Sequence, residues 1–208
     1  MQGLLCDDMV TSRLVLIAIT PEMLQSEQRD DHRLGELLHA SIPSNWPPVD
    51  WDPHVLAILL RQFELYPDQI GWHRHIVLPH EDGSRTLIGS VGAFWRESSP
   101  NECEIGYSIL QPHEGQGLAT EATQALIDYL RENRRGPRLT SVIAHTFPRL
   151  VGSIRVMEKC GLVFEGAGEE EGRSVTGCVC EVRWMDCGLQ GLKPTCMQRP
   201  YGTAEAVP

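Results

Sequence analysis

Apolar positions along the chain follow two spacings, and the changes between them mark an alternation of strands and helices. Residues 13–20 are aliphatic and β-branched, which favours a buried strand, and Pro21 suits the first turn of a helix behind it. Helical spacing then occurs twice, at Leu34, Leu37 and Leu38 and at Val55, Leu59 and Phe63 behind the expected N-cap Asp52. A strand followed by helices is therefore predicted to open the domain.

Residues 40–51 interrupt the helical pattern with three prolines, which remove backbone donors and predict an irregular loop. The loop carries Trp46 and Trp51, whose rings have a large apolar body and a polar tip. The two rings either line a substrate pocket, which makes both of them candidate substrate-binding residues, or anchor the loop on the core.

Residues 75–78, 85–94 and 103–110 have the composition of strands, with turn residues between them, so a meander is expected. The pattern then changes to helix at 118–131, strand at 139–146, helix at 153–160 and strands at 162–165 and 175–185. This alternation predicts an α/β domain whose sheet is partly parallel.

Length and composition limit the classes of protein that remain. At 208 residues the chain fits one domain, residues 1–187, and the loss of periodicity afterwards predicts a flexible tail at 188–208. Seven cysteines without a C-x-x-C pair indicate reduced thiols rather than a disulfide framework. Eight histidines without ligand spacing give no reason to expect a metal.

The net charge of −10 argues against a nucleic-acid partner, because nucleic-acid affinity comes largely from lysine and arginine on phosphates. The first twelve residues lack the basic start and apolar core of a signal peptide. The apolar runs are far shorter than the roughly 20 residues that cross a bilayer. A cytoplasmic protein without a membrane partner is therefore expected.

The most informative segment is residues 104–130, where a predicted strand runs through a glycine-containing turn into an amphipathic helix. Gly115 and Gly117 remove side chains where the backbone bends, so that successive N–H groups can converge on one point. At a helix N-terminus, such unused donors and the helix dipole bind phosphate. A cofactor that carries a pyrophosphate is the expected ligand.

This segment resembles the cofactor signature of the GNAT family of N-acetyltransferases, Q/R-x-x-G-x-G/A. Residues 114–119 (EGQGLA) fall on the signature, and residues 120–122 (TEA) continue it as family members commonly do. Similarity to the ribosomal-protein acetyltransferases of the RimJ/RimL branch extends over most of residues 11–186. It is carried by residues 11–14 (TSRL), 104–107 (EIGY), 144–146 (AHT) and 153–162 (SIRVMEKCGL).

The resemblance implies an α/β fold with a mixed, mostly antiparallel central sheet of about seven strands and about four flanking helices. It also implies acetyl-CoA as the cofactor, with its pantetheine arm between two strands that splay apart. The implied cofactor-binding residues are Ile109, Leu110, Gln111, Gly115, Gln116, Gly117, Leu118, Ala119, Thr120 and Ser153. Backbone N–H groups near Ile109 and Leu110 are expected to serve the thioester carbonyl.

Glu104 is the leading candidate for the general base, because it lies at about the position of the base glutamate in family histone acetyltransferases. It shares one face of a predicted strand with Gly106 and Ser108. A solvated or salt-bridged carboxylate is the alternative role. His145, at the end of a later predicted strand, is the second catalytic candidate and could relay a proton.

Three residues depart from the family pattern. Glu114 puts a carboxylate where the signature has glutamine or arginine. Leu150 stands where relatives often have an asparagine, and Met157 stands where some have a tyrosine proposed as general acid. The residue that protonates the departing thiolate is therefore unassigned.

The implied function is transfer of an acetyl group from acetyl-CoA to a primary amine, on a protein N-terminus or a small molecule, by direct attack in a ternary complex. A non-catalytic acyl-CoA-binding or sensor protein is the alternative that the three departures suggest. A dinucleotide-binding oxidoreductase would need G-x-G-x-x-G after an early strand, which the sequence lacks. A monomer and a homodimer both stay open.

Overall fold

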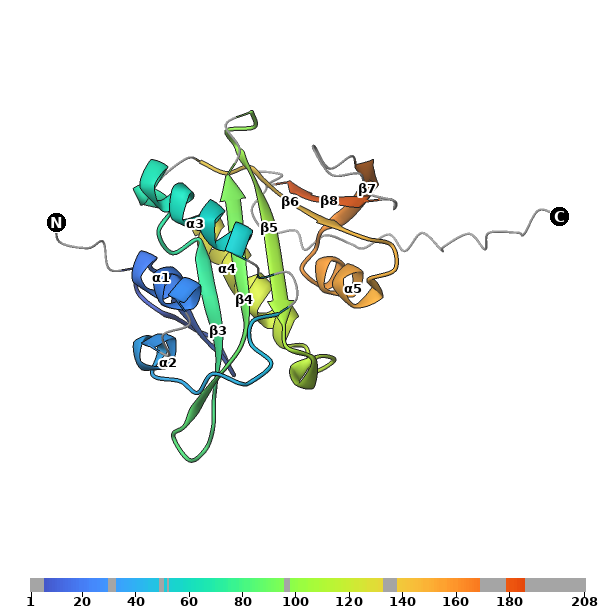
Figure 1. Cartoon of the computed structure of the whole chain (residues 1–208). Coiled ribbons are helices and arrows are strands. Elements are labelled where there is room, and N and C mark those ends of the chain that lie inside the picture. The colour runs from blue at the N-terminus through green and yellow to red at the C-terminus, as the bar shows by residue number, and fades with distance from the viewer. Residues whose placement is uncertain are drawn as a thin grey trace.

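The computed structural model describes residues 6–29, 33–48, 51, 53–95, 98–132, 138–168 and 179–185 (Figure 1). Its strands are β1 (Met9–Val10), β2 (Val15–Ala18), β3 (His73–Pro79), β4 (Arg85–Trp95), β5 (Glu102–Ile109), β6 (Ser141–Thr146), β7 (Val163–Gly168) and β8 (Val179–Met185). Its α-helices are α1 (Pro21–Arg29), α2 (Arg33–Leu38), α3 (Pro53–Leu65), α4 (Leu118–Glu132) and α5 (Val151–Lys159). Two 3-10 helices, η1 (Pro67–Gln69) and η2 (Gln111–His113), complete the described elements.

The strands form one eight-stranded sheet in the order β1-β2-β3-β4-β5-β6-β8-β7. Only the β5–β6 pair is parallel, and the other neighbouring pairs are antiparallel. The predicted class, a mixed and mostly antiparallel sheet with flanking helices, is confirmed. The described residues contain one strand and one α-helix more than expected, in part because the two-residue β1 carries no pattern that a sequence window could detect.

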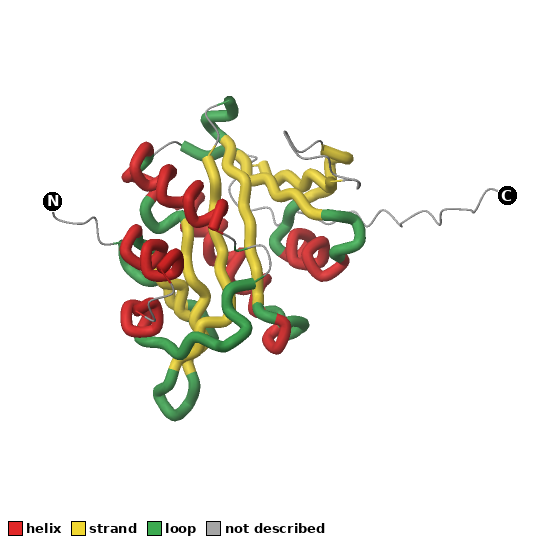
Figure 2. The backbone as a smooth tube through the Cα atoms, viewed as in Figure 1, coloured by secondary structure: helices red, strands yellow, loops and turns green. Residues whose placement is uncertain are grey.

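Strands β5 and β6 pair over only three residues before they part. Glu102–Glu104 of β5 lie opposite Ser141–Ile143 of β6. Beyond this point β5 stays paired with β4 as far as Ile109, whereas β6 pairs with β8 as far as Thr146. Figure 2 shows β6, β8 and β7 turning away from the long strands β3, β4 and β5. A gap therefore opens along the last five residues of β5.

The two faces of the sheet carry different cores, because side chains alternate along each strand. Leu14 and Leu16 pack with buried residues of α4 and α5. Val15 and Ile17 pack instead with buried residues of α1 and α2, and α3 joins α1 around Leu24. Helices α4 and α5 thus cover one face, and α1, α2 and α3 cover the other.

The observed elements match the predicted ones with modest changes at their ends. The predicted meander is strands β3, β4 and β5, and the predicted helix after Pro21 is α1. The predicted first strand shortens to Val15–Ala18, because the preceding residues 11–13 turn toward α4 instead of pairing. The expected N-cap Asp52 and the expected tail at 188–208 lie outside the described residues.

Candidate active site

Two glycines with left-handed backbones shape the loop that joins β5 to α4. Gly115 and Gly117 have φ values of 72° and 78°. A non-glycine residue in this region of φ would destabilise the fold by about 1–3 kcal/mol. The predicted bend therefore exists. Residues 114–117 are exposed, and they lead directly into the N-terminus of the fifteen-residue helix α4.

Unused backbone donors collect at this bend. Among hydrogen bonds between described residues, none uses the N–H groups of residues 115–120, and the first helical bond runs from Glu121 to the Gly117 carbonyl oxygen (3.0 Å). These orphan donors add to the positive end of the helix dipole. A Cβ on Gly115 would meet no heavy atom within 4 Å, so the space beside the loop is open. The donor set fits a diphosphate such as that of coenzyme A.

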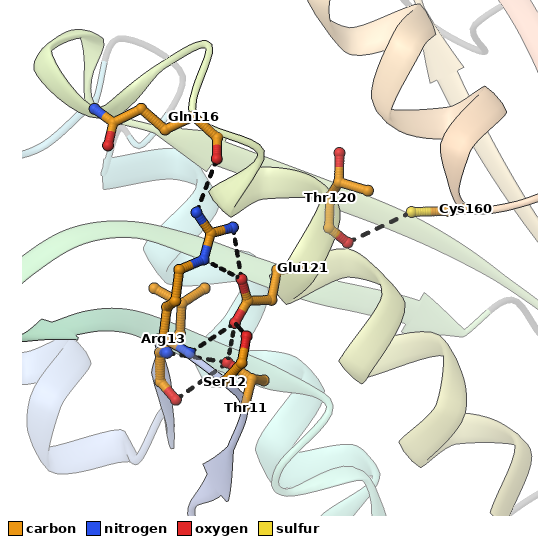
Figure 3. A network of polar contacts seen from close by, with 8 residues as sticks. Thr11, Ser12, Arg13, Gln116, Thr120, Glu121 and Cys160 are labelled. Carbon is orange, nitrogen blue, oxygen red and sulfur yellow. Dashed lines mark hydrogen bonds and ion pairs between the residues drawn. The ribbon is translucent and has the colours of Figure 1, made fainter.

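Glu121, in the first turn of α4, ties this loop to the start of the sheet (Figure 3). Its carboxylate accepts hydrogen bonds from Thr11 Oγ1 (2.6 Å), Ser12 Oγ (2.9 Å), and the backbone N–H and Nε–H of Arg13 (2.9 and 2.7 Å). Nη1 of Arg13 also donates to the carbonyl oxygen of Gln116 (2.9 Å). Burial would raise the pKa of Glu121, but the hydrogen bonds outweigh burial and lower the pKa to about 2.

The two backbone donors expected at the thioester carbonyl differ in direction. The N–H of Leu110 donates to the carbonyl oxygen of Ile88 (2.8 Å), so the prediction that Leu110 offers a donor is wrong. In an antiparallel ladder, hydrogen-bonded and non-hydrogen-bonded pairs alternate. Ile109, which lies opposite Gly89, therefore directs its N–H away from β4 and into the gap beside β5. Ile109 remains the candidate donor.

Glu104 and His145 form one pair across the parallel strands. Glu104 lies opposite Ile143, and His145 is on the same face of β6 two residues further along. Nδ1 of His145 lies 2.7 Å from Oε1 of Glu104, and the side chains are 20% and 27% exposed. The structure thus joins the two catalytic candidates at the point where the gap begins. The contact with His145 also fits the alternative role of Glu104 as a salt-bridged carboxylate. The two roles are compatible, because His145 could hold Glu104 in the orientation that a base needs.

Open space lies on the sheet beside this pair. Gly106, on the same face of β5 as Glu104, is exposed, and a Cβ there would meet no heavy atom within 4 Å. Its neighbour Gly92 on β4 differs, because a Cβ there would lie 2.1 Å from Nδ1 of His73. Burial lowers the pKa of His73 from 6.5 to about 3, so this imidazole is neutral. The sheet is therefore open at Gly106 and closed at its neighbour Gly92.

The two loop tryptophans are half-buried and cluster with the buried side chains of His75 in β3 and Glu27 in α1. The Trp46 and Trp51 rings lie 6.2 Å apart and 5.6 and 6.0 Å from the His75 ring. Nε1 of Trp51 donates to Oε2 of Glu27, and Nε2 of His75 lies 3.1 Å from Oε1 of Glu27 without hydrogen-bond geometry. These contacts favour the anchoring alternative for both tryptophans. Their role in substrate binding stays a prediction.

Ser153, in α5, meets Tyr107 of β5 on the α4 side of the gap. The Tyr107 hydroxyl donates to the Ser153 carbonyl oxygen (2.8 Å) and lies 3.0 Å from Ser153 Oγ. Burial raises the pKa of Tyr107 to about 12 despite this contact with Ser153. Met157, at the position where some relatives have a tyrosine, is 2% exposed, whereas Leu150 is 46% exposed. The tyrosine hydroxyl beside α5 therefore belongs to Tyr107 of β5, whereas α5 itself has Met157 at the position of the relatives' tyrosine.

The other implied cofactor-binding residues surround the bend. Gln111 is exposed in η2, and the Gln116 side chain donates to the Pro112 carbonyl oxygen (3.2 Å). Leu118 is buried, and Ala119 and Thr120 are half-buried in the first turn of α4. The side chain of Leu118 therefore secures the helix to the core, and the contribution expected of these positions is their main-chain N–H groups.

Sequence reasoning missed the contacts of Arg13 with the loop and those of Glu27 and His75 with the tryptophans. Arg13 belongs to the TSRL motif and Glu121 to the TEA motif. Neither motif indicates that the two side chains, 108 residues apart, form a hydrogen bond. Glu27 on a helix and His75 on a strand are ordinary residues in the sequence. Only their burial, at 6% and 0% side-chain exposure, marks them.

Comparison with known proteins identifies the family. The model of the acetyltransferase (GNAT) domain family matches residues 19–163, well over half of the chain. The chain belongs to the GNAT family of acetyltransferases. A curated relative of this GNAT domain, "Probable N-acetyltransferase YjcK" of Bacillus subtilis, is 36% identical over 81 residues. That match covers 38% of the chain and 43% of YjcK, so the chain spans less than half the length of this relative.

Solved structures share the fold of this GNAT domain. An acetyltransferase from Agrobacterium tumefaciens has a TM-score of 0.55 at 22% identity, over 87% of this chain and 95% of that one. RimL, a ribosomal L7/L12 α-N-protein acetyltransferase solved with coenzyme A, has a TM-score of 0.56 at 16% identity, over 86% and 98% of the two chains. At these identities the likeness concerns the fold alone.

In the part of the chain that the structure describes, no helix is both long and apolar enough to span a bilayer. Nor do these residues bring together three histidine, cysteine, aspartate or glutamate side chains that could hold a metal ion.

Proposed function

We propose that this GNAT domain transfers an acetyl group from acetyl-CoA to a primary amine, on a protein N-terminus or a small molecule, by direct attack in a ternary complex. The Glu104–His145 pair, at the end of the β5–β6 gap where the two strands part, carries the proposal. The unused donors of residues 115–120 follow the other end of β5, beyond about 17 Å of strand that lines the gap. A donor anchored at one end and an acceptor at the other would meet inside the gap.

Different segments of the chain would bind different parts of the cofactor. Residues 115–120 would hold the diphosphate through main-chain N–H groups, and β5 would line the arm that enters the gap. Acetyl-CoA, when bound, would supply the acetyl group as an activated thioester. Gln111, Ala119, Thr120 and Ser153 are proposed to border this path. The solved RimL protein of the same fold holds coenzyme A, which supports the choice of cofactor.

The acceptor must be a neutral amine before it attacks, so a proton must leave it. Glu104 and His145 would accept that proton as a unit. In one arrangement Glu104 orients His145 through Nδ1 and leaves Nε2 as the basic nitrogen. In the other, Glu104 takes the proton and His145 passes it on. The Ile109 N–H would stabilise negative charge that develops on the acyl oxygen.

A panel of amines tests this proposal. Wild-type protein and Glu104→Gln are incubated with acetyl-CoA and N-terminal peptides, polyamines or amino sugars, and free thiol is read over time. We expect release with at least one acceptor and a loss of about 10²–10⁴-fold in kcat for Glu104→Gln, the range typical of a lost general base. Unchanged turnover in this variant would remove Glu104 from the proton-transfer role.

A non-catalytic acyl-CoA sensor is the second candidate, because α5 offers neither of the two polar groups of its relatives. Leu150 caps the start of α5 without a side-chain hydrogen bond, and Met157 is buried. A sensor would show calorimetric heat and a thermal shift with acetyl-CoA but no thiol release with any amine. Binding without release across the panel would favour this candidate over the enzyme.

A further inference from the structure

The segment Thr11-Ser12-Arg13 is joined to the bend before α4 by a dense set of polar contacts, as Figure 3 shows. Both oxygens of Glu121 are engaged, and Nη2 of Arg13 lies 2.7 Å from Oε2 in addition to the hydrogen bonds given above. Glu121 is 16% exposed and Arg13 is 47% exposed. An ordinary surface ion pair contributes little, but a multidentate arginine held by a partly buried carboxylate is fixed in one orientation.

The orientation of Arg13 determines the orientation of a peptide group in the loop. Its Nη1 donates to the Gln116 carbonyl oxygen (2.9 Å), while the same guanidinium is held on Glu121. The carbonyl of Gln116 and the N–H of Gly117 belong to one planar trans peptide, so they point in opposite directions. Since the carbonyl faces Arg13, the Gly117 N–H must point away from Arg13. That N–H is one of the donors that lack an acceptor among the described residues.

The short distance between Arg13 and Gly117 supports the same orientation of the Gln116–Gly117 peptide. A Cβ on Gly117 would lie 3.7 Å from Nη2 of Arg13, which is van der Waals contact. The Arg13 side chain therefore lies beside Gly117 as well as donating to the carbonyl oxygen of Gln116. Because the charge of Arg13 is balanced by Glu121, its main effect on the loop is one of position rather than of added positive charge.

We propose that Arg13 is a positioning residue for the diphosphate of coenzyme A, anchored by Glu121 and acting through the Gln116–Gly117 peptide. The inference rests on the proposed function, because it assumes that residues 115–120 hold a diphosphate. Preorganised donors bind more tightly than donors that must be ordered during binding. Loosening Arg13 should therefore weaken the part of the cofactor that contains the diphosphate and leave the acetyl end unaffected.

A truncated donor separates this role from a general structural one. Acetyl-CoA contains the diphosphate, whereas acetyl-pantetheine ends before it. In Arg13→Lys, which keeps the charge and loses the fork, we expect the Kd of coenzyme A by calorimetry and the KM of acetyl-CoA to rise about tenfold, as for a lost charged hydrogen bond. Both kcat and the kcat/KM for acetyl-pantetheine should stay within about twofold of wild type.

Arg33→Lys is the matched control. Nη2 of Arg33 lies 2.6 Å from Oε1 of Glu22, at 49% exposure of the arginine, so the control also alters an exposed arginine–glutamate pair. That pair joins α1 to α2, and the control should leave the Kd of coenzyme A unchanged. Glu121→Gln, which keeps Arg13 but weakens its anchor, should raise the Kd in the same direction as Arg13→Lys.

The outcomes are distinguishable. Equal Kd values for coenzyme A in wild type and Arg13→Lys would overturn the inference, and so would parallel losses with acetyl-CoA and acetyl-pantetheine. If Arg13→Lys melts below the assay temperature, Glu121→Gln gives the same contrast between the two donors. Absence of heat with coenzyme A in the wild type would instead sink the proposed function.

Discussion

The two ends of the β5–β6 gap are built in different ways. At the α4 end, the donors are main-chain N–H groups from the continuous segment 115–120, and side chains serve mainly to hold that segment in place. At the other end, Glu104 and His145 lie 41 residues apart on two strands, and their proposed roles would use their side chains. The cofactor end therefore depends on backbone conformation, and the acceptor end depends on which side chains the fold brings together.

A double-mutant cycle on the Glu104–His145 pair should have the largest effect. Glu104→Gln and His145→Gln each remove one partner of a unit, so each should lower kcat by about 10²–10⁴-fold. The double variant should be no slower than the slower single variant, because groups that act together are not additive. Purely additive losses would show that the two residues act separately. The Kd of coenzyme A should change less than about twofold in all three.

As the pH falls, protonation of His73 should weaken the fold well before protonation of Glu121 breaks its contacts with residues 11–13. An unfolded His73 binds a proton at about pH 6.5 and the folded one only near its lowered pKa of about 3, so its contribution to stability is lost as the pH falls from 6.5. We expect urea unfolding to show a loss of about 2 kcal/mol between pH 6.5 and pH 5. His73→Gln should flatten that part of the curve.

Glu121 loses its contribution in a lower pH range than His73 does. Its pKa is lowered from 4.5 to about 2, so its contribution is complete above pH 4.5 and disappears only as the pH falls toward 2. Glu121→Gln should therefore lower stability at neutral pH without changing the slope between pH 6.5 and pH 5. A slope unchanged by His73→Gln would show that other groups account for the acid sensitivity.

A glycine substitution in the loop should separate cofactor binding from stability. Gly117→Ala places a side chain at φ 78°, and Gly83→Ala does so at φ 83° in the turn between β3 and β4, where a Cβ meets nothing within 4 Å. Both variants should lose about 1–3 kcal/mol of stability or shift their local backbone. Only Gly117→Ala should raise the Kd of coenzyme A, by about tenfold. Equal Kd values in the two variants would contradict the role of the loop.

The smallest expected effect concerns Glu114, an exposed carboxylate beside the proposed diphosphate site. Glu114→Gln removes a repulsive charge, so the Kd of coenzyme A should fall by about two- to threefold in low salt. The gain should vanish at about 0.5 M salt, where charges several ångströms apart are screened. Weaker binding by this variant would mean that the carboxylate supports the loop instead of opposing the ligand.

Local rules were enough to predict the elements that depend on neighbouring residues. The meander β3–β4–β5, the bend at Gly115 and Gly117 and the helix after it follow from side-chain periodicity and from glycine, both of which act over a few positions. The prediction for Leu110 was wrong because its N–H is used by Ile88, and that pairing depends on the register of a neighbouring strand.

The sequence by itself determined the mixed sheet with flanking helices and the glycine bend at the start of α4. Only the tertiary structure decided that His145 meets Glu104, that Arg13 donates to the Gln116 carbonyl oxygen and that Trp51 donates to Glu27. The reason is physical. Helix and turn formation are governed by residues a few positions apart, whereas these contacts join side chains whose distance is fixed by strand register and by the packing of helices on the sheet.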